Sequence, residues 1–263
     1  MQKKLFLKLL IASFLTIGLN ADHLWLAVES QTNKFKDQEY YLTKKVSNLE
    51  NEINHAWERG FEVTDLEFGR HRWMAIFSKT DKPKKQIYIS KLYLAEILKS
   101  FESYKEKGYY LKDIEQGSSR WIALFEKDKT IKDEIILHNE SIDTFKQALR
   151  QKLQENYKVI NIANGDGEWI ALLAKTDNFK SQTFTITQSW ADTRKTIKYR
   201  WDEGYDITQI KYGSDGWITV FSKGTNFKNQ GYDSVSKLYM FDKTIKQKWK
   251  DGFYITTITD GRE

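Results

Sequence analysis

Residues that can bind a metal ion recur at one place in the chain, two positions before a tryptophan. The residues at that place are His23, His71, Ser119, Gly167 and Asp215. Two imidazoles and a carboxylate form a ligand set that divalent metals accept. A metal-dependent hydrolase with His23, His71 and Asp215 at its site is therefore one alternative function. Arg70 and Arg72 flank His71 and disfavour a cation there, so the leading expectation includes no metal site.

Lysines recur as regularly and define a second candidate site. One lysine occurs in the same turn of all five copies of a repeat, and another begins that turn in four copies. They are Lys36, Lys84, Lys132, Lys180 and Lys228, with Lys79, Lys127, Lys175 and Lys223. Ammonium groups gathered on one rim would attract an anionic glycan, another envelope polymer or a partner protein. The alternative is that these lysines are solvated and only discourage aggregation.

A third set of charged residues shortly precedes the tryptophans and offers an alternative partner surface. It contains Arg70, Arg72 and Arg120, together with Asp166 and Glu168. Paired carboxylates can support hydrolysis, but nothing distinguishes these two from ordinary turn acids. The sequence has no serine elbow, phosphate-binding glycine loop, zinc-type His/Glu helix or dinucleotide fingerprint. We therefore expect no catalytic residue and no cofactor, and a non-enzymatic binding or scaffold module.

The elements that position these residues come from an internal repeat. Tryptophans are spaced by 48 residues, at Trp25, Trp73, Trp121, Trp169 and Trp217. Further registers with the same spacing are Gly69, Gly117, Gly165, Gly213 and Gly261; Gln38, Gln86, Glu134, Gln182 and Gln230; and Gly60, Gly108, Asn156, Gly204 and Gly252. Such a period indicates a repeat architecture. Five units fill residues 24–263, and we assign residues 22–263 to a single domain.

Each unit is predicted to contain a strand, a strand, a helix and a strand. The run at 73–77 is apolar throughout, as in a strand buried on both faces, and residues 205–210 alternate as in a strand with one buried face. Apolar residues four apart indicate a helix, for which Ser47 and Glu50 have the spacing of a capping box. We expect Asn156 to take the left-handed conformation that follows a helix.

The order of elements predicts how the ends of the chain are used. The first unit opens with a tryptophan strand at 24–28, and the last unit finishes with a third strand at 253–260. Each end supplies the strand that the other lacks. We expect an α/β fold in which the two ends pair and seal a closed five-fold ring, an α/β propeller without exposed sheet edges.

Two resemblances follow from these patterns. The motif Trp201-x-x-Gly204-Tyr205-x-Ile207-Thr208, continued by Gly213, Trp217, Ser222-Lys223 and Gln230, resembles a Trp/Gly repeat domain. That domain occurs in bacterial proteins of unknown function and at the C-terminus of some plant casein-kinase-like kinases. The unit order and five-fold count resemble the pentein fold. Many pentein enzymes use a cysteine nucleophile, and this chain has no cysteine, so the resemblance implies architecture only.

Composition and the first residues predict where the protein acts. The chain has 263 residues, of which 40% are hydrophobic and 14% aromatic, and this excludes a wholly disordered protein. Residues 1–21 read as a signal peptide, with three lysines before an apolar run. An uncleaved membrane anchor is the alternative. Cleavage lowers the net charge from +6 to +3, which argues against nucleic-acid binding. We expect a periplasmic or secreted protein with no stable membrane span.

Overall fold

The computed structural model describes residues 23–263; the predicted signal peptide, 1–21, lies outside the described residues. The described chain repeats the predicted order of strand, strand, helix and strand in five units. The elements are β1 (His23–Gln31), β2 (Phe35–Thr43), α1 (Val46–Glu58) and β3 (Glu62–Gly69); β4 (Arg72–Thr80), β5 (Gln86–Lys91), α2 (Leu94–Glu106) and β6 (Tyr110–Gly117); β7 (Arg120–Glu126), β8 (Ile131–Asn139), α3 (Ile142–Gln154) and β9 (Lys158–Gly165); β10 (Glu168–Thr176), β11 (Ser181–Thr187), α4 (Trp190–Asp202) and β12 (Asp206–Gly213); β13 (Gly216–Lys223), β14 (Gln230–Val235), α5 (Leu238–Lys250) and β15 (Phe253–Arg262).

The strands form five separate three-stranded antiparallel sheets, not one continuous sheet. Their strand orders are β2-β4-β3, β5-β7-β6, β8-β10-β9, β11-β13-β12 and β14-β1-β15. In each sheet the middle strand carries a tryptophan of the 48-residue register. This strand is buried on both faces, which explains its continuous apolar sequence. The fold is therefore an α/β repeat, as the sequence predicts.

The first strand of the described chain lies between the last two. Trp25 of β1 is opposite Val235 of β14 on one side and Asp260 of β15 on the other. The sheet that contains the end of the chain thus takes its middle strand from the beginning. This pairing of the two ends agrees with the prediction from the order of elements.

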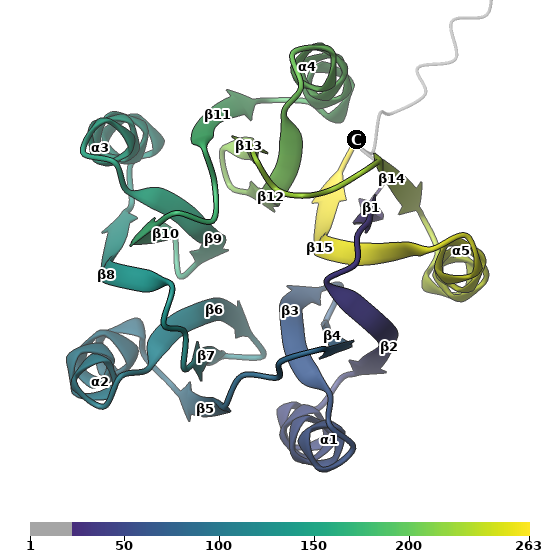
Figure 1. Ribbon diagram of the computed structural model, residues 1–263. Coiled ribbons are helices and arrows are strands. Elements are labelled where there is room, and N and C mark those ends of the chain that lie inside the picture. Colours follow the sequence, from purple (N-terminus) through teal and green to yellow (C-terminus); the bar gives the residue numbers. More distant parts are fainter. Residues whose placement is uncertain (1–22) are drawn as a thin grey trace, which may run out of the picture.

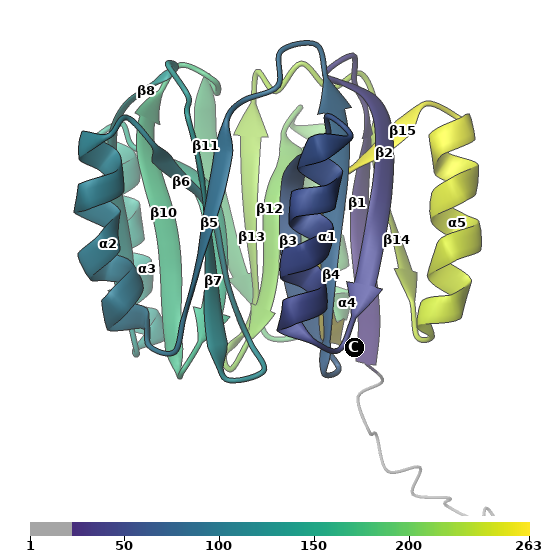
Figure 2. The ribbon, with the colours of Figure 1, turned by 90° about the horizontal axis from the view of Figure 1, so that it is seen from below.

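The five sheets are arranged about a common centre, each with one helix on its outer side (Figure 1). Strands β3, β6, β9, β12 and β15 lie innermost; neighbours in this series contact each other, and β15 contacts β3. The helices run alongside the sheets (Figure 2). Turns such as the one between β4 and β5 lie at the end where the helices finish, and we call this end the lysine rim. Turns such as the one between β3 and β4 lie at the opposite end, the Gly–Trp rim.

Local features of the helices agree in part with the sequence. Asn156 follows the end of α3 with φ of 66°, the left-handed conformation that the repeat predicts for it. The predicted capping box at Ser47 is wrong: the N-cap of α1 is Lys45, which makes no side-chain cap hydrogen bond. Ser47 is therefore inside the helix, where its hydroxyl cannot cap the first turn.

The glutamine register joins each sheet to the next. Gln38 Oε1 accepts a hydrogen bond from the Ile255 amide at 2.8 Å, and its Nε2 donates to the Ile255 carbonyl at 2.9 Å. Gln86, Gln182 and Gln230 make the same pair of bonds to residues 63, 159 and 207. The side-chain amide suits this role because it donates and accepts at once.

Candidate functional site

The lysine rim gathers the predicted lysines at one end of the sheets. Four of them lie in turns, as expected, but Lys36, Lys79, Lys132, Lys175 and Lys223 lie in the terminal residues of strands. In the first lysine set, Lys36 forms an ion pair with Asp81, and Lys132 Nζ lies 2.5 Å from Asp177 Oδ2. Lys84 Nζ lies 2.8 Å from Glu126 Oε1 and 2.5 Å from an oxygen of Asp128. These ion pairs neutralise part of the charge that the sequence predicts for the rim. Because the Lys36 and Lys132 pairs are exposed, each stabilises the fold only slightly.

The second lysine set packs on aromatic rings. Lys79 Nζ lies 4.5 Å from the centroid of Phe61, and Lys223 Nζ lies 4.4 Å from that of Tyr205. Lys127 and Lys175 lie in the same way over Tyr109 and Tyr157, each at 4.9 Å. Each ring belongs to the residue that follows the glycine or asparagine after a helix. Sequence reasoning found the lysines but not their contact with these rings, which is a cation–π interaction.

Lys180 and Lys228 differ from the rest of the first set. Both side chains are exposed, and within residues 23–263 neither forms an ion pair. Their backbones are fixed, since the Lys180 amide donates to the Lys223 carbonyl and the Lys228 amide donates to the Gln31 carbonyl, at 2.8 and 2.9 Å. The uncompensated charge of the first set is thus concentrated on two neighbouring turns.

The structure does not bring the three candidate metal ligands together. His23 Nδ1 lies 3.8 Å from Asp260 Oδ2, and burial, then Arg262 and Arg70, lower the pKa of His23. His71 is exposed in a tight turn with φ of 60°. Asp215 Oδ2 accepts a hydrogen bond from Trp169 Nε1 at 2.9 Å. Among residues 23–263 no group of three His, Cys, Asp or Glu side chains is arranged to hold a metal ion.

The alternative partner residues on the Gly–Trp rim are largely held by contacts within the chain. Arg70 Nε lies 3.3 Å from Asp260 Oδ1, and Arg70 also donates to the Ser236 carbonyl. Arg120 donates to Ser90 Oγ at 3.5 Å, and Glu168 Oε2 lies 2.6 Å from His138 Nδ1. Arg72 is half-buried. These contacts indicate a structural role for most of this set.

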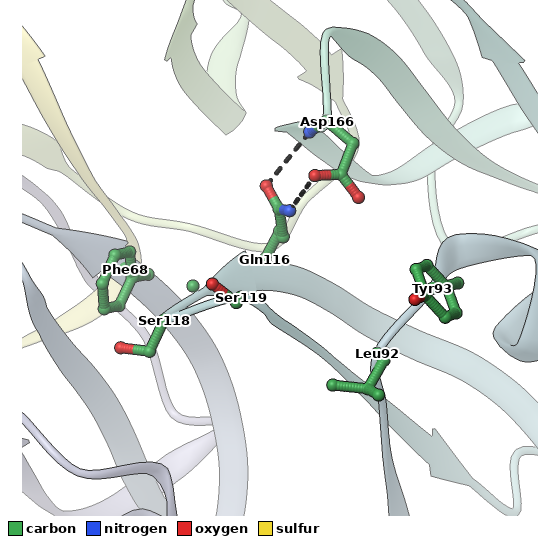
Figure 3. Close-up of a pocket in the computed structure, with 8 residues that line it drawn as sticks. Phe68, Leu92, Tyr93, Gln116, Ser118, Ser119 and Asp166 are labelled. Atoms are coloured by element: carbon green, nitrogen blue, oxygen red, sulfur yellow. Dashed lines mark hydrogen bonds between the residues drawn. The ribbon is translucent and has the colours of Figure 1, made fainter.

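Asp166 closes one side of a pocket on the same rim (Figure 3). Gln116 Nε2 donates a hydrogen bond to Asp166 Oδ1, and the Asp166 backbone amide donates to Gln116 Oε1. Asp166 Oδ2 also accepts a hydrogen bond from Trp121 Nε1 at 2.9 Å. On another side lie Leu92, 51% exposed, and Tyr93, 66% exposed. The pocket has a volume of about 460 Å³ and is lined by Phe68, Leu92, Tyr93, Gln116, Gly117, Ser118, Ser119 and Asp166. Sequence reasoning missed this pocket, although a Leu-Tyr pair at a position that is polar in the other copies was visible.

The inner strands carry a buried polar cluster that the sequence analysis also missed. Lys211 Nζ lies 2.6 Å from Glu67 Oε2 and 2.6 Å from Glu115 Oε2. Burial raises the pKa of both carboxyls, against the opposing effect of Lys211. Beside them, Asp65 accepts from the Ile258 amide at 2.6 Å and Asp113 from the Leu66 amide at 2.9 Å. These bonds link one inner strand to the next, so the cluster holds the sheets together.

Comparison with known proteins gives one family. Residues 99–263 match the family described as a domain of unknown function, DUF7477. The match covers more than half of the chain and spans the last three helices with their strands. Among curated proteins, none matches this chain. The function must therefore be argued from the geometry of the surfaces described above.

Proposed function

We propose, on the premise that the chain belongs to the DUF7477 family of domains of unknown function, that it is a non-enzymatic binding module. Its lysine rim is the binding surface, and its ligand is an anionic polymer such as an envelope glycan. The protein acts after export, in the periplasm or outside the cell, once the leader at residues 1–21 has been removed. No helix within residues 23–263 is long and apolar enough to cross a membrane.

The proposed architecture is a closed α/β propeller of the pentein type, built from Trp/Gly repeats. It is supported by the position of β1 between β14 and β15 and by contacts between the first and last units. Asp65 accepts from the Ile258 amide, and Gln38 bonds both polar groups of the Ile255 backbone. A closed arrangement places all five lysine turns on one rim, where one extended ligand can reach several of them.

The observation that carries the proposed function is the exposure of Lys180 and Lys228. Their backbones are fixed by hydrogen bonds to neighbouring turns, and their side chains have no carboxylate partner within residues 23–263. Lys175 and Lys223, which lie on rings next to the same two turns, add positive charge nearby. A polyanion gains from several such contacts at once, because positive potential from clustered charges adds.

The test is retention on immobilised heparin. Lys180→Gln/Lys228→Gln should elute at a clearly lower salt concentration than the unchanged chain, since exposed charges are screened by salt. Lys195→Gln/Lys198→Gln is the matched control: it removes two exposed lysines from α4, each paired with a nearby aspartate. Equal shifts for both variants would mean that only net charge matters and would reject a rim site. Absence of retention at low salt would reject the polyanion ligand.

A further inference from the structure

Three helices are fastened to the next sheet by an indole. Trp57 Nε1 donates to Gln86 Oε1 at 3.1 Å, joining α1 to β5. Trp201 bonds Gln230 in the same way at 3.0 Å, and Trp249 bonds Gln38 at 2.8 Å. The same glutamine oxygen also accepts a backbone amide, so at each of these joints it accepts two hydrogen bonds.

The joint between α2 and β8 lacks this indole. Lys105 stands where the others have tryptophan, and Glu134 stands where they have glutamine. Glu134 Oε2 accepts a hydrogen bond from the Leu111 amide at 3.0 Å. Lys105 Nζ does not approach that oxygen; it donates to Asp133 Oδ1 at 3.1 Å and to the Glu134 main-chain carbonyl at 2.8 Å. Within residues 23–263, the Glu134 carboxyl therefore accepts one hydrogen bond where the three glutamines accept two.

A pocket of about 340 Å³ lies at this joint. Its lining comes from one face of α2 and from β8: Leu98, Phe101, Glu102, Lys105, Glu134, Ile135, Ile136 and His138. Glu134 is fully buried, and the pocket walls combine apolar side chains such as Phe101 and Ile136 with the polar side chains of Glu102, Lys105 and His138. At the α3–β11 joint, which also lacks the tryptophan, Leu153 packs against the core of its unit.

We propose that this pocket binds a planar aromatic group with an N–H donor, an indole, that lies between α2 and β8 and donates to Glu134 Oε2. The ligand would displace the Lys105 side chain, which stands at this position of the repeat, and take the place of the tryptophan that the chain supplies at three other joints. Its source is either a free indole compound or a tryptophan side chain of a peptide. This site is independent of the lysine rim and of the function proposed for it.

The protonation of Glu134 suits a neutral ligand. Burial raises the pKa of its carboxyl to about 8, so the group is protonated near neutral pH. Its Oε1 has no hydrogen-bond partner and stands in the role of the glutamine Nε2, which at other joints donates to a backbone carbonyl. With the proton on Oε1, Oε2 remains an acceptor, and a neutral N–H donor matches it better than a cation.

The experiment titrates the full chain with indole, N-acetyl-tryptophanamide and 1-methylindole. Binding is measured by the change in backbone amide chemical shifts in NMR spectra and by the change in melting temperature. Indole should raise the melting temperature and shift signals of α2 and β8. 1-Methylindole, which lacks the donor, should bind about fivefold more weakly, as expected for one hydrogen bond. N-acetyl-tryptophanamide distinguishes the sources: tighter binding than indole indicates a peptide side chain, and weaker binding a free compound. Equal affinity for indole and 1-methylindole, or binding of neither indole nor the amide, would overturn the proposal.

Two variants locate the site. Lys105→Trp supplies the missing side chain from the helix itself and should abolish indole binding, whereas Leu153→Trp at the α3–β11 joint is the matched control and should leave binding intact. Glu134→Leu removes the acceptor without adding bulk beyond the original side chain and should erase the preference for indole over 1-methylindole. Retention of that preference in Glu134→Leu would overturn the site, whether or not Lys105→Trp folds.

Discussion

Lys211 and Glu67 are 144 residues apart in the sequence, yet Lys211 Nζ lies 2.6 Å from Glu67 Oε2 in the interior. The same ammonium lies 2.6 Å from Glu115. All three side chains are buried, and they come from β12, β3 and β6. A single cation therefore holds three inner strands that do not pair with one another in any sheet.

Replacing this cation should be costly. Lys211→Met keeps an unbranched apolar side chain one atom shorter than lysine but leaves two buried carboxyls without their partner. Loss of one partner of a buried pair costs about 3–5 kcal/mol, and we expect the free energy of unfolding to fall by about that amount in urea denaturation. Lys198→Met, which removes an exposed pair with Asp202, is the control and should change it by less than about 1 kcal/mol. A loss this small in Lys211→Met would contradict the assigned role.

Glu134 should make stability depend on pH. Burial raises the pKa of its carboxyl in the folded protein to about 8. At pH values where this carboxyl is ionised in the unfolded chain and protonated in the folded protein, folding takes up a proton. The resulting stabilisation is complete below the unfolded pKa near 4.5 and is lost as pH rises through about 8. Glu134→Gln provides the amide of the other joints without a titrating group. Unfolding curves between about pH 6 and 8 should show a shallower decline for this variant, and an unchanged slope would count against the argument.

Glu29 occupies a position that is apolar in the other four sheets, where Phe77, Phe125, Leu173 and Phe221 stand. It is fully buried, neither carboxyl oxygen has a hydrogen-bond partner, and Lys248 Nζ is 3.8 Å away. Burial, then the nearby Asp233, raises the pKa of Glu29 to about 8. We expect Glu29→Leu to raise the melting temperature, and to do so more at pH 8 than at pH 5, where the carboxyl is protonated and uncharged. Destabilisation at pH 8 would show that the carboxylate is needed.

Two buried tryptophans of the same register should respond differently to loss of the indole N–H. Trp121 Nε1 donates to Asp166 at 2.9 Å, whereas Trp73 Nε1 has no partner. Both side chains are fully buried, so replacement by phenylalanine removes a similar volume. Trp121→Phe should cost about 1 kcal/mol more than Trp73→Phe, the contribution of one hydrogen bond. Chemical denaturation of the two variants measures the difference, and equal losses would show that the bond contributes nothing.

The sequence predicted the features that repeat and missed those that depend on differences between copies. The 48-residue register was sufficient for the middle strands, because a residue such as Trp25 that recurs at one place must lie in one environment. It also predicted the pairing of the two ends and the conformation of Asn156. The ion pair of Lys211 was not found, although this lysine stands in the register of Glu67 and Glu115. Opposite charges at one position of a repeat are a signal for contact between copies.

The candidate sites were harder to predict because turns depend on tertiary contacts. Lys79 and Phe61 each belong to a regular register, but their contact depends on how the end of a helix meets the following turn. His23 and His71 were grouped because their positions in the repeat are equivalent. The structure instead places His23 beside Asp260 and bonds Asp215 to Trp169, so these side chains do not converge on one ion.

The place of β1 has a consequence for biosynthesis. Its hydrogen-bonding partners, β14 and β15, follow the other four sheets in the sequence, so this apolar strand must remain unpaired while those sheets are synthesised. Folding from the ribosome can complete four sheets in order but cannot complete the sheet of β14, β1 and β15 until β15 has emerged. A nascent chain with this topology needs β1 to form no wrong strand pairing before β14 and β15 are available, either because β1 pairs slowly or because a chaperone covers it.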